Sequence, residues 1–143
     1  MSLTAGNLRN IPTSYATVSI GCRDEHTLSK KLEAISSAGF QAIELGFPDL
    51  LAFASTYLKK EVGPYDYDDL VISGKVVKAM CEAKKLKILM LQPFANFEGW
   101  QEGSDERKDA FTRAEGWIKI MEAVGTDMLQ VRRSYIQPDD NHI

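Results

Sequence analysis

Short apolar runs alternate with longer amphipathic segments along this chain. The runs at residues 15–20, 40–45, 88–91 and 128–131 are rich in β-branched, aromatic or aliphatic side chains, and they predict four short buried strands. No hairpin turn signal separates neighbouring runs. We therefore expect crossover connections between the strands, which implies that the strands are parallel.

The segments between the strands predict helices. Apolar residues recur there at intervals of three and four, which is the spacing of one face of a helix. We expect helices over residues 27–39, 49–58, 67–85 and 104–125, the second of them short and followed by an elaborated polar loop. With the short second helix counted as part of this elaborated loop, the order of elements is β, α, β, α, β, α, β.

The last helix has the clearest ends. Ser104 and Asp105 are favourable helix starters, and Gly125 is a typical residue to end a helix. Its apolar positions at helical spacing are Phe111, Ala114, Ile118 and Met121.

The alternation predicts an α/β fold with parallel strands and right-handed crossovers. Four units in residues 1–131 correspond to roughly 33 residues per unit, so eight units would need about 260 residues, the usual size of a barrel. We therefore predict the N-terminal half of a (β/α)₈ TIM barrel, with four parallel strands and flanking helices. Residues 1–131 would form this partial domain and residues 132–143 a divergent polar tail.

A flavodoxin-like doubly wound module would also satisfy the alternation. Such a fold normally has a glycine-rich or phosphate-binding loop after its first strand. Residues 21–24 read Gly-Cys-Arg-Asp, with one glycine and an acidic residue. The sequence at this loop is a poor match to a nucleotide-binding site.

Composition excludes several classes of function. The net charge is −3 with acidic and basic residues interspersed, so a primary role in nucleic-acid binding is not expected. The apolar runs are far shorter than the roughly 20 residues that cross a bilayer, and no secretion signal is evident, which predicts a cytosolic protein without membrane association. Cys22 and Cys81 form no CxxC pair, and we expect both to be reduced thiols.

Three short motifs carry a resemblance to a known family. They are the strand GFQAIEL at residues 39–45, the strand end LQPF at 91–94 and the strand entry GTD at 125–127. With their flanking segments they closely resemble fungal members of the xylose isomerase-like TIM barrel superfamily. Members are commonly labelled sugar phosphate isomerase/epimerase and are similar to fungal 3-dehydroshikimate dehydratases. The resemblance runs from about residue 11 to residue 131.

The resemblance implies a metal-dependent isomerase, epimerase or dehydratase (a lyase) acting on a small polyhydroxylated or sugar-like substrate. In such enzymes a divalent cation, Mn²⁺, Mg²⁺ or Co²⁺, polarises substrate oxygens while a side chain moves the proton next to a carbonyl. The family's metal ligands lie in the second half of the barrel. We therefore expect this chain to be a truncated form that lacks the metal site and is inactive alone. It also departs from the family after strand four, where Arg132 and Arg133 replace small residues.

Barrel enzymes place their working residues at the C-terminal ends of the strands, which selects Glu44, Gln92 and Phe94 as candidate substrate-binding residues. A carboxylate amid apolar neighbours needs a hydrogen-bonding partner, so Glu44 would contact substrate or belong to an internal polar network. Gln92 offers a donor and an acceptor for substrate or for a structural bond. Phe94, with Phe97 and Trp100, would form an apolar wall or lid, or pack in the core.

Other polar residues have simpler interpretations. His26 is interpreted as an exposed residue at a helix start rather than as a catalytic base, and His142 lies in the tail. Asp66, Asp68 and Asp69 lie just before or at the start of a helix. A favourable interaction of their negative charges with the helix dipole is a simpler explanation for this cluster than metal binding.

A second hypothesis concerns the polypeptide as it stands. Four strands would leave open edges at residues 15–20 and 128–131, together with an apolar face. The alternative function is thus a non-catalytic half-barrel that self-associates.

Overall fold

A computed structural model describes residues 11–21 and 23–132 of the chain. The elements alternate in the expected order. They are β1 (Ser14–Ala16), the 3₁₀ turn η1 (Thr17–Ser19), α2 (Leu28–Ser37), β2 (Ala42–Gly46), α3 (Phe47–Leu58), α4 (Tyr67–Ala83), β3 (Lys87–Ala95), α5 (Asp105–Val124) and β4 (Leu129–Arg132).

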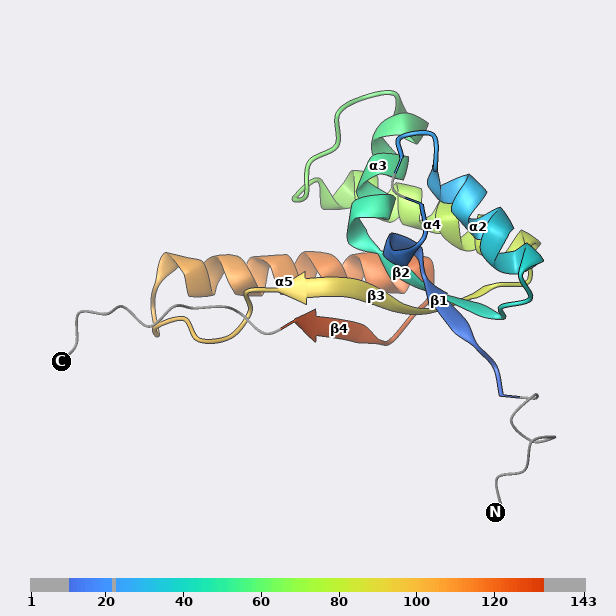
Figure 1. The fold of residues 1–143 in the computed structure, drawn as a ribbon. Coiled ribbons are helices and arrows are strands. Elements are labelled where there is room, and N and C mark those ends of the chain that lie inside the picture. The colour runs from blue at the N-terminus through green and yellow to red at the C-terminus, as the bar shows by residue number, and fades with distance from the viewer. Residues whose placement is uncertain (1–10, 22, 133–143) are drawn as a thin grey trace, which may run out of the picture.

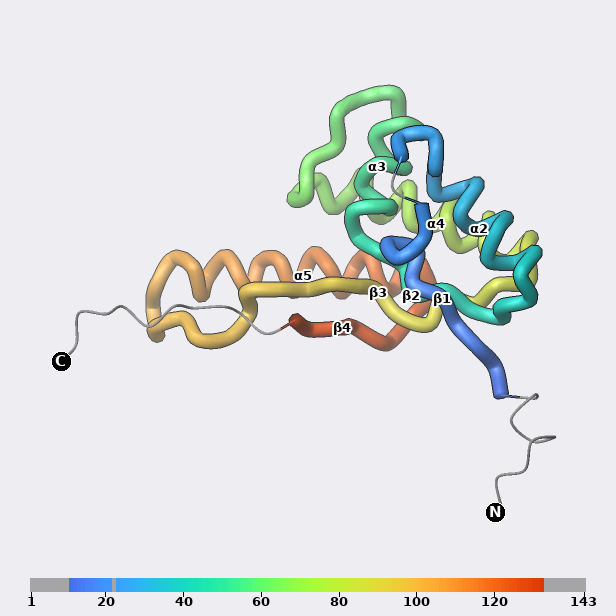
Figure 2. Tube along the Cα trace, in the orientation of Figure 1, coloured from blue at the N-terminus to red at the C-terminus, as the bar shows by residue number. Residues whose placement is uncertain are grey.

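The four strands form one parallel sheet in the order β1-β2-β3-β4. Figure 1 shows α2, α3 and α4 grouped beside the first half of the sheet, while α5 runs along β3 and β4. The chain can be followed from β1 to β4 in Figure 2, and the strands lie in the sheet in the same order as in the sequence, with β1 and β4 at the two edges. The predicted α/β fold with four parallel strands is confirmed.

The core lies between the sheet and its helices. Ile43 and Leu45 of β2 and Leu91 of β3 are fully buried and join helix residues such as Leu32 of α2 and Val77 of α4 in one cluster. Each such side chain contributes roughly 1.5–3 kcal/mol through removal from water. Because side chains alternate along a strand, the residues between these core positions project from the opposite face of the sheet.

The first strand is shorter than the prediction of residues 15–20. β1 ends at Ala16, and the chain turns through η1. The side-chain oxygen of buried Thr17 accepts a hydrogen bond from the backbone of Gly46 at 2.9 Å, and Lys31 donates to the Thr17 carbonyl at 3.1 Å. These side-chain bonds replace the strand ladder, so the β-rich composition of this run was misleading.

The third strand is longer than the predicted residues 88–91. β3 continues through Pro93 to Ala95 because it keeps parallel partners on both sides: Gly46 pairs with Gln92, and Ala95 pairs with Arg132. The register is irregular between Leu91 and Phe94, around the proline that has no N–H to donate.

α5 has the predicted ends but a different buried face. The Ser104 hydroxyl caps it by accepting from the Arg107 backbone at 3.2 Å, and Gly125 ends it in the left-handed region with φ 78°. The stripe that marked the helix in the sequence is only partly on its buried side: Ala114 and Met121 pack against the core, whereas Phe111 and Ile118 are 50% and 52% exposed. The buried residues of α5 are Ala110, Gly116, Trp117, Ile120, Ala123 and Val124.

Helices α4 and α5 meet at a glycine. A Cβ built on Gly116 of α5 would lie 2.2 Å from the ring of Tyr67, the first residue of α4. The Tyr67 ring therefore occupies the space that any other residue at position 116 would need.

We expect Gly116→Ala to destabilise the protein. Overpacking against Tyr67 costs about 1–3 kcal/mol, which outweighs the gain of about 1 kcal/mol in helix propensity. In a Tyr67→Ala background the same change should become stabilising. Urea unfolding of the four proteins of this cycle measures both effects, with Glu115→Ala at the exposed neighbouring position as the control. Equal effects of Gly116→Ala in both backgrounds would rule out the packing explanation.

Candidate functional site

Glu44 and Gln92 lie on the sheet face opposite the helices. Glu44 projects between the core residues Ile43 and Leu45, and Gln92 follows Leu91 near the end of β3. The Gln92 side-chain amide donates to Glu44 Oε2 at 3.1 Å. The hydroxyl of Ser14 on β1 donates to Glu44 Oε1 at 3.3 Å. Two of the three predicted substrate-binding residues are thus brought into direct contact.

The Glu44 carboxylate is held by neutral donors. Gln92 is 7% exposed, whereas Glu44 is partly buried. Among residues 11–21 and 23–132, no lysine or arginine forms an ion pair with Glu44. A carboxylate in this setting has remaining lone pairs with which to accept hydrogen bonds from ligand hydroxyl groups. Glu44 thus has hydrogen-bonding partners of the kind that a carboxylate amid apolar neighbours needs, and its contact with substrate stays a prediction.

A buried ion pair supports the same end of the sheet. Lys31 of α2 is 8% exposed and contacts Asp49 Oδ1 at 2.7 Å, in addition to its bond with the Thr17 carbonyl. A Cβ on Gly46 would lie 2.2 Å from Val18, so η1 rests directly on the end of β2. Sequence reasoning missed this network, although Lys31 lies between Leu28 and Leu32 on the apolar face of α2.

Phe94, the third candidate, points into the helix layer, although Gln92 two residues earlier lies on the other face, because the strand is irregular between Leu91 and Phe94. It is 2% exposed, and its ring lies 5.0 Å from that of Trp117 and 5.7 Å from that of Phe97. The guanidinium of Arg113 lies over the same ring at 5.2 Å. Phe94 therefore packs in the core beneath α5, and its contact with substrate stays a prediction.

The loop after β3 is tied to α5 by Arg113. This side chain donates to the carbonyls of Ala95 at 2.9 Å and Asn96 at 2.7 Å, and to Asp109 at 2.8 Å. The Tyr65 hydroxyl donates to the other oxygen of Asp109 at 2.8 Å. Hydrogen bonds from Arg113 and Tyr65 lower the pKa of Asp109 below its ordinary value of 3.8. The i, i+4 spacing of Asp109 and Arg113 is a local signal of their ion pair, whereas the contacts with Tyr65 and with the loop carbonyls have no such signal.

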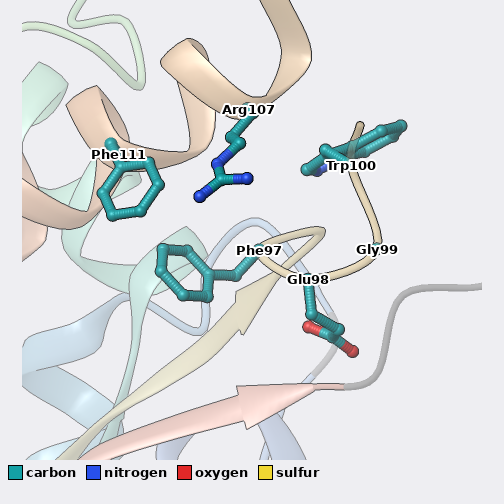
Figure 3. A pocket seen from close by; sticks show the side chains of 6 residues that line it. All are labelled: Phe97, Glu98, Gly99, Trp100, Arg107 and Phe111. Atoms are coloured by element: carbon teal, nitrogen blue, oxygen red, sulfur yellow. The ribbon is translucent and has the colours of Figure 1, made fainter. Parts of the chain in front are cut away.

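A shallow aromatic pocket lies beyond this clamp (Figure 3). Phe97 and Trp100 from the β3–α5 loop face Phe111 and Arg107 from α5 across a space of about 210 Å³. The Trp100 indole N–H donates to the Asn96 carbonyl at 3.0 Å, which anchors the loop. Of the aromatic residues named as a possible wall or lid, Phe97 and Trp100 line this pocket.

The other polar residues considered in the sequence have contacts or positions that explain them without a catalytic role. The ring nitrogen of His26 accepts from the Arg23 backbone at 3.4 Å, in the loop before α2. Asp68 and Asp69 lie in the first turn of α4, as expected. Burial raises the pKa of the free Cys81 thiol to about 12, whereas Cys22 and His142 lie outside the described residues.

Side chains that commonly bind metals are not clustered in the described part of the chain. In residues 11–21 and 23–132, no three His, Cys, Asp or Glu side chains converge where they could hold an ion. The same part of the chain contains no helix that is long and apolar enough to span a membrane.

The chain is similar to a known family of barrels over most of its length. The sequence model of the family described as xylose isomerase-like TIM barrel matches residues 32–142. This match includes most of the segment predicted to be a divergent tail, and the division at residue 131 stays a prediction.

Two curated relatives carry the same name. A 3-dehydroshikimate dehydratase of Neurospora crassa is 27% identical over 90% of this chain and 37% of its own length. A 3-dehydroshikimate dehydratase of Pseudomonas putida is 34% identical over 82% of this chain and 15% of its own length. The chain therefore spans well under half of either relative.

A solved structure has a similar fold. A xylose isomerase-like TIM barrel/4-hydroxyphenylpyruvate dioxygenase fusion protein superposes with a TM-score of 0.61 and 32% identity, covering 85% of this chain and 16% of that protein. Together with the parallel sheet, this likeness agrees with half of a barrel.

We expect Asp109→Asn to lower the thermal stability at pH 7 and to have a diminishing effect in acid. Because the folded-state pKa of Asp109 is depressed, its contribution is present above about pH 3.8 and is lost as the pH falls through the folded pKa. Melting temperatures at pH 3, 5 and 7 test this, with exposed Asp127→Asn as the control. A difference from the parent protein that stays constant over this range would contradict the clamp.

Proposed function

The chain belongs to the xylose isomerase-like TIM barrel family, and from this membership we propose that it forms one half of a barrel enzyme acting on a small polyhydroxylated substrate with a carbonyl group. The half described here would supply substrate contacts, and a divalent metal, Mn²⁺, Mg²⁺ or Co²⁺, would be held by residues of the other half. A cytosolic location and the absence of nucleic-acid binding stay predictions.

Dehydration is the reaction that we favour over isomerisation or epimerisation. Both curated relatives are named for the dehydration of 3-dehydroshikimate. In such a reaction a base removes a proton from the carbon next to the carbonyl, and a hydroxyl group leaves with a proton as water. Substrate hydroxyl groups must therefore be held in a fixed orientation.

The contact between Glu44 and Gln92 is the observation that carries this proposal. Two polar side chains from adjacent parallel strands meet at 3.1 Å on the face without helices, which is the interior face of a closed barrel. Ser14 and Gln92 fix the orientation of the Glu44 carboxylate before substrate arrives. The carboxylate then accepts hydrogen bonds from substrate hydroxyl groups, and Gln92 is a positioning residue that also offers an amide oxygen.

We expect no turnover of 3-dehydroshikimate by the 143-residue chain and measurable turnover when a related C-terminal half completes the barrel, in the presence of Mn²⁺, Mg²⁺ or Co²⁺. In the completed barrel, Glu44→Gln should lower kcat/KM roughly 10- to 100-fold, because a charged acceptor of substrate hydroxyl groups is lost. Gln92→Leu should have a smaller effect through disorientation of Glu44. The rate of product formation, followed by absorbance, is measured for the completed barrel and for its Glu44→Gln and Gln92→Leu variants.

The exposed carboxylate variant Glu61→Gln serves as the matched control and should retain full activity. If the completed and folded barrel turned over neither 3-dehydroshikimate nor ketose substrates with any of the three metals, the enzymatic proposal would be abandoned. Activity unaffected by Glu44→Gln would remove Glu44 from the substrate site.

A second candidate function is self-association of a non-catalytic half-barrel. Edge strand β4, the residue before it and helix α5 carry large apolar side chains with about half of their surface exposed. They are Phe111 at 50%, Ile118 at 52%, Met128 at 45% and Val131 at 52%. A parallel edge strand beside apolar surface favours association with another chain.

We expect size-exclusion chromatography with light scattering to give a mass above the 16.0 kDa of one chain. Ile118→Glu and Val131→Glu should shift the protein toward the monomer, because each adds a charge to the open apolar edge. Ile72→Glu is the matched control, since Ile72 of α4 is equally exposed at 49% but lies away from this edge. A monodisperse, cooperatively melting monomer would contradict self-association.

A further inference from the structure

The aromatic pocket contains a cation that no carboxylate neutralises. Arg107 lies in the first turns of α5, and its guanidinium faces the space between Phe97, Phe111 and Trp100 (Figure 3). In residues 11–21 and 23–132, no aspartate or glutamate forms an ion pair with it. Its guanidinium contact is with the Phe111 ring, at 5.8 Å from the ring centre.

Two of the acidic residues near Arg107 in the sequence have other partners. Asp105 contacts Lys108 at 2.8 Å, and Asp109 is held by Arg113 and Tyr65. Glu98 lines the pocket through its backbone side, while its carboxylate points away from Arg107 in Figure 3. Arg107 therefore retains its hydrogen-bonding fork for an incoming anion.

The walls of the pocket select the shape of that anion. The rings of Phe97 and Phe111 meet edge to face at 5.5 Å, and Trp100 closes the opposite side. Flat aromatic walls bind planar rings by stacking and edge contacts. Asp105 and Glu106 in the first turn of α5 add negative charge nearby, which disfavours a doubly charged ligand.

We propose that this pocket binds a small planar ring bearing one carboxylate. The carboxylate pairs with the guanidinium of Arg107, and the ring lies against Phe97, Phe111 and Trp100. The space of about 210 Å³ accommodates one six-membered ring with its carboxylate. The proposal that such a ring binds rests on the geometry of the pocket and not on the proposed enzymatic function.

The identity of the natural ligand rests on the proposed function. A dehydratase acting on 3-dehydroshikimate handles a carboxylated six-membered ring as substrate and as product. The pocket follows β3, the strand that carries Gln92, so it lies in the loop region where barrel enzymes receive their ligands. Arg107 would then select for the carboxylated ring among polyhydroxylated carbonyl compounds.

The test uses the intact 143-residue chain and benzoate as the probe. The chain has two tryptophans, Trp100 in the pocket and Trp117 in the core, so its two indole N–H signals in a ¹⁵N–¹H spectrum distinguish the sites. Titration with benzoate should shift the Trp100 signal in a saturable way and leave the Trp117 signal nearly unchanged. A Trp117→Phe variant assigns the two signals.

Charge and shape are tested with matched probes. Benzyl alcohol, which has the ring without the charge, acetate, which has the charge without the ring, and inorganic phosphate should each bind at least 10-fold more weakly than benzoate. Arg107→Gln should weaken benzoate binding at least 10-fold, and Arg107→Lys by a smaller factor because the charge remains. Lys119→Gln, an equal loss of charge at an exposed position of α5, should have no effect.

Equal affinity for benzoate and benzyl alcohol, or unchanged binding in a folded Arg107→Gln protein, would overturn the proposal. If Arg107→Gln fails to fold, the comparison of probes on the parent protein and the Arg107→Lys variant decides the same point. The measurement needs neither metal nor turnover. A failure of the dehydratase assay thus leaves the binding result intact, and a failure of benzoate binding leaves the dehydratase proposal to its own test.

Discussion

The parallel pairing of β2 with β3 is the constraint on which the rest of the structure depends. It directs Ile43, Leu45 and Leu91 into the helix layer, where they form the centre of the core. The same alternation forces Glu44 and Gln92 onto the opposite face, where they contact each other. Core and candidate site are therefore two sides of one strand pair, and a shift of register by one residue would bury the carboxylate against the helices.

Polar side chains help to fix the segments that follow β1 and β3. Lys31 holds the turn after β1 through Thr17, and Arg113 holds the loop after β3 through two backbone carbonyls. Each cation also has a carboxylate partner, which offsets the cost of its partial burial. These contacts position the Glu44 region and the aromatic pocket relative to the sheet.

The apolar stripe that the sequence shows on α5 differs from the face of the helix that is buried. The sequence placed apolar residues at Phe111 and Ile118 with helical spacing, yet the buried face of the helix contains Trp117 and Ile120 instead. In the described part of the chain, Phe111 and Ile118 stay about half exposed. Periodicity identifies an amphipathic helix, but it does not distinguish a core face from an edge face.

The sequence by itself determined the element order, the parallel α/β architecture and the family, because these follow from local propensity, from apolar spacing and from short motifs at strand ends. It also placed Glu44 and Gln92 near the C-terminal ends of their strands, where barrel enzymes carry their working residues. Only the tertiary structure decided where β1 stops, which face of α5 is buried, and how Arg107 comes to face Phe97 and Trp100. Those features depend on contacts between residues far apart in the chain, such as Lys31 with Asp49 and Tyr65 with Asp109, and local sequence carries no information about such distances.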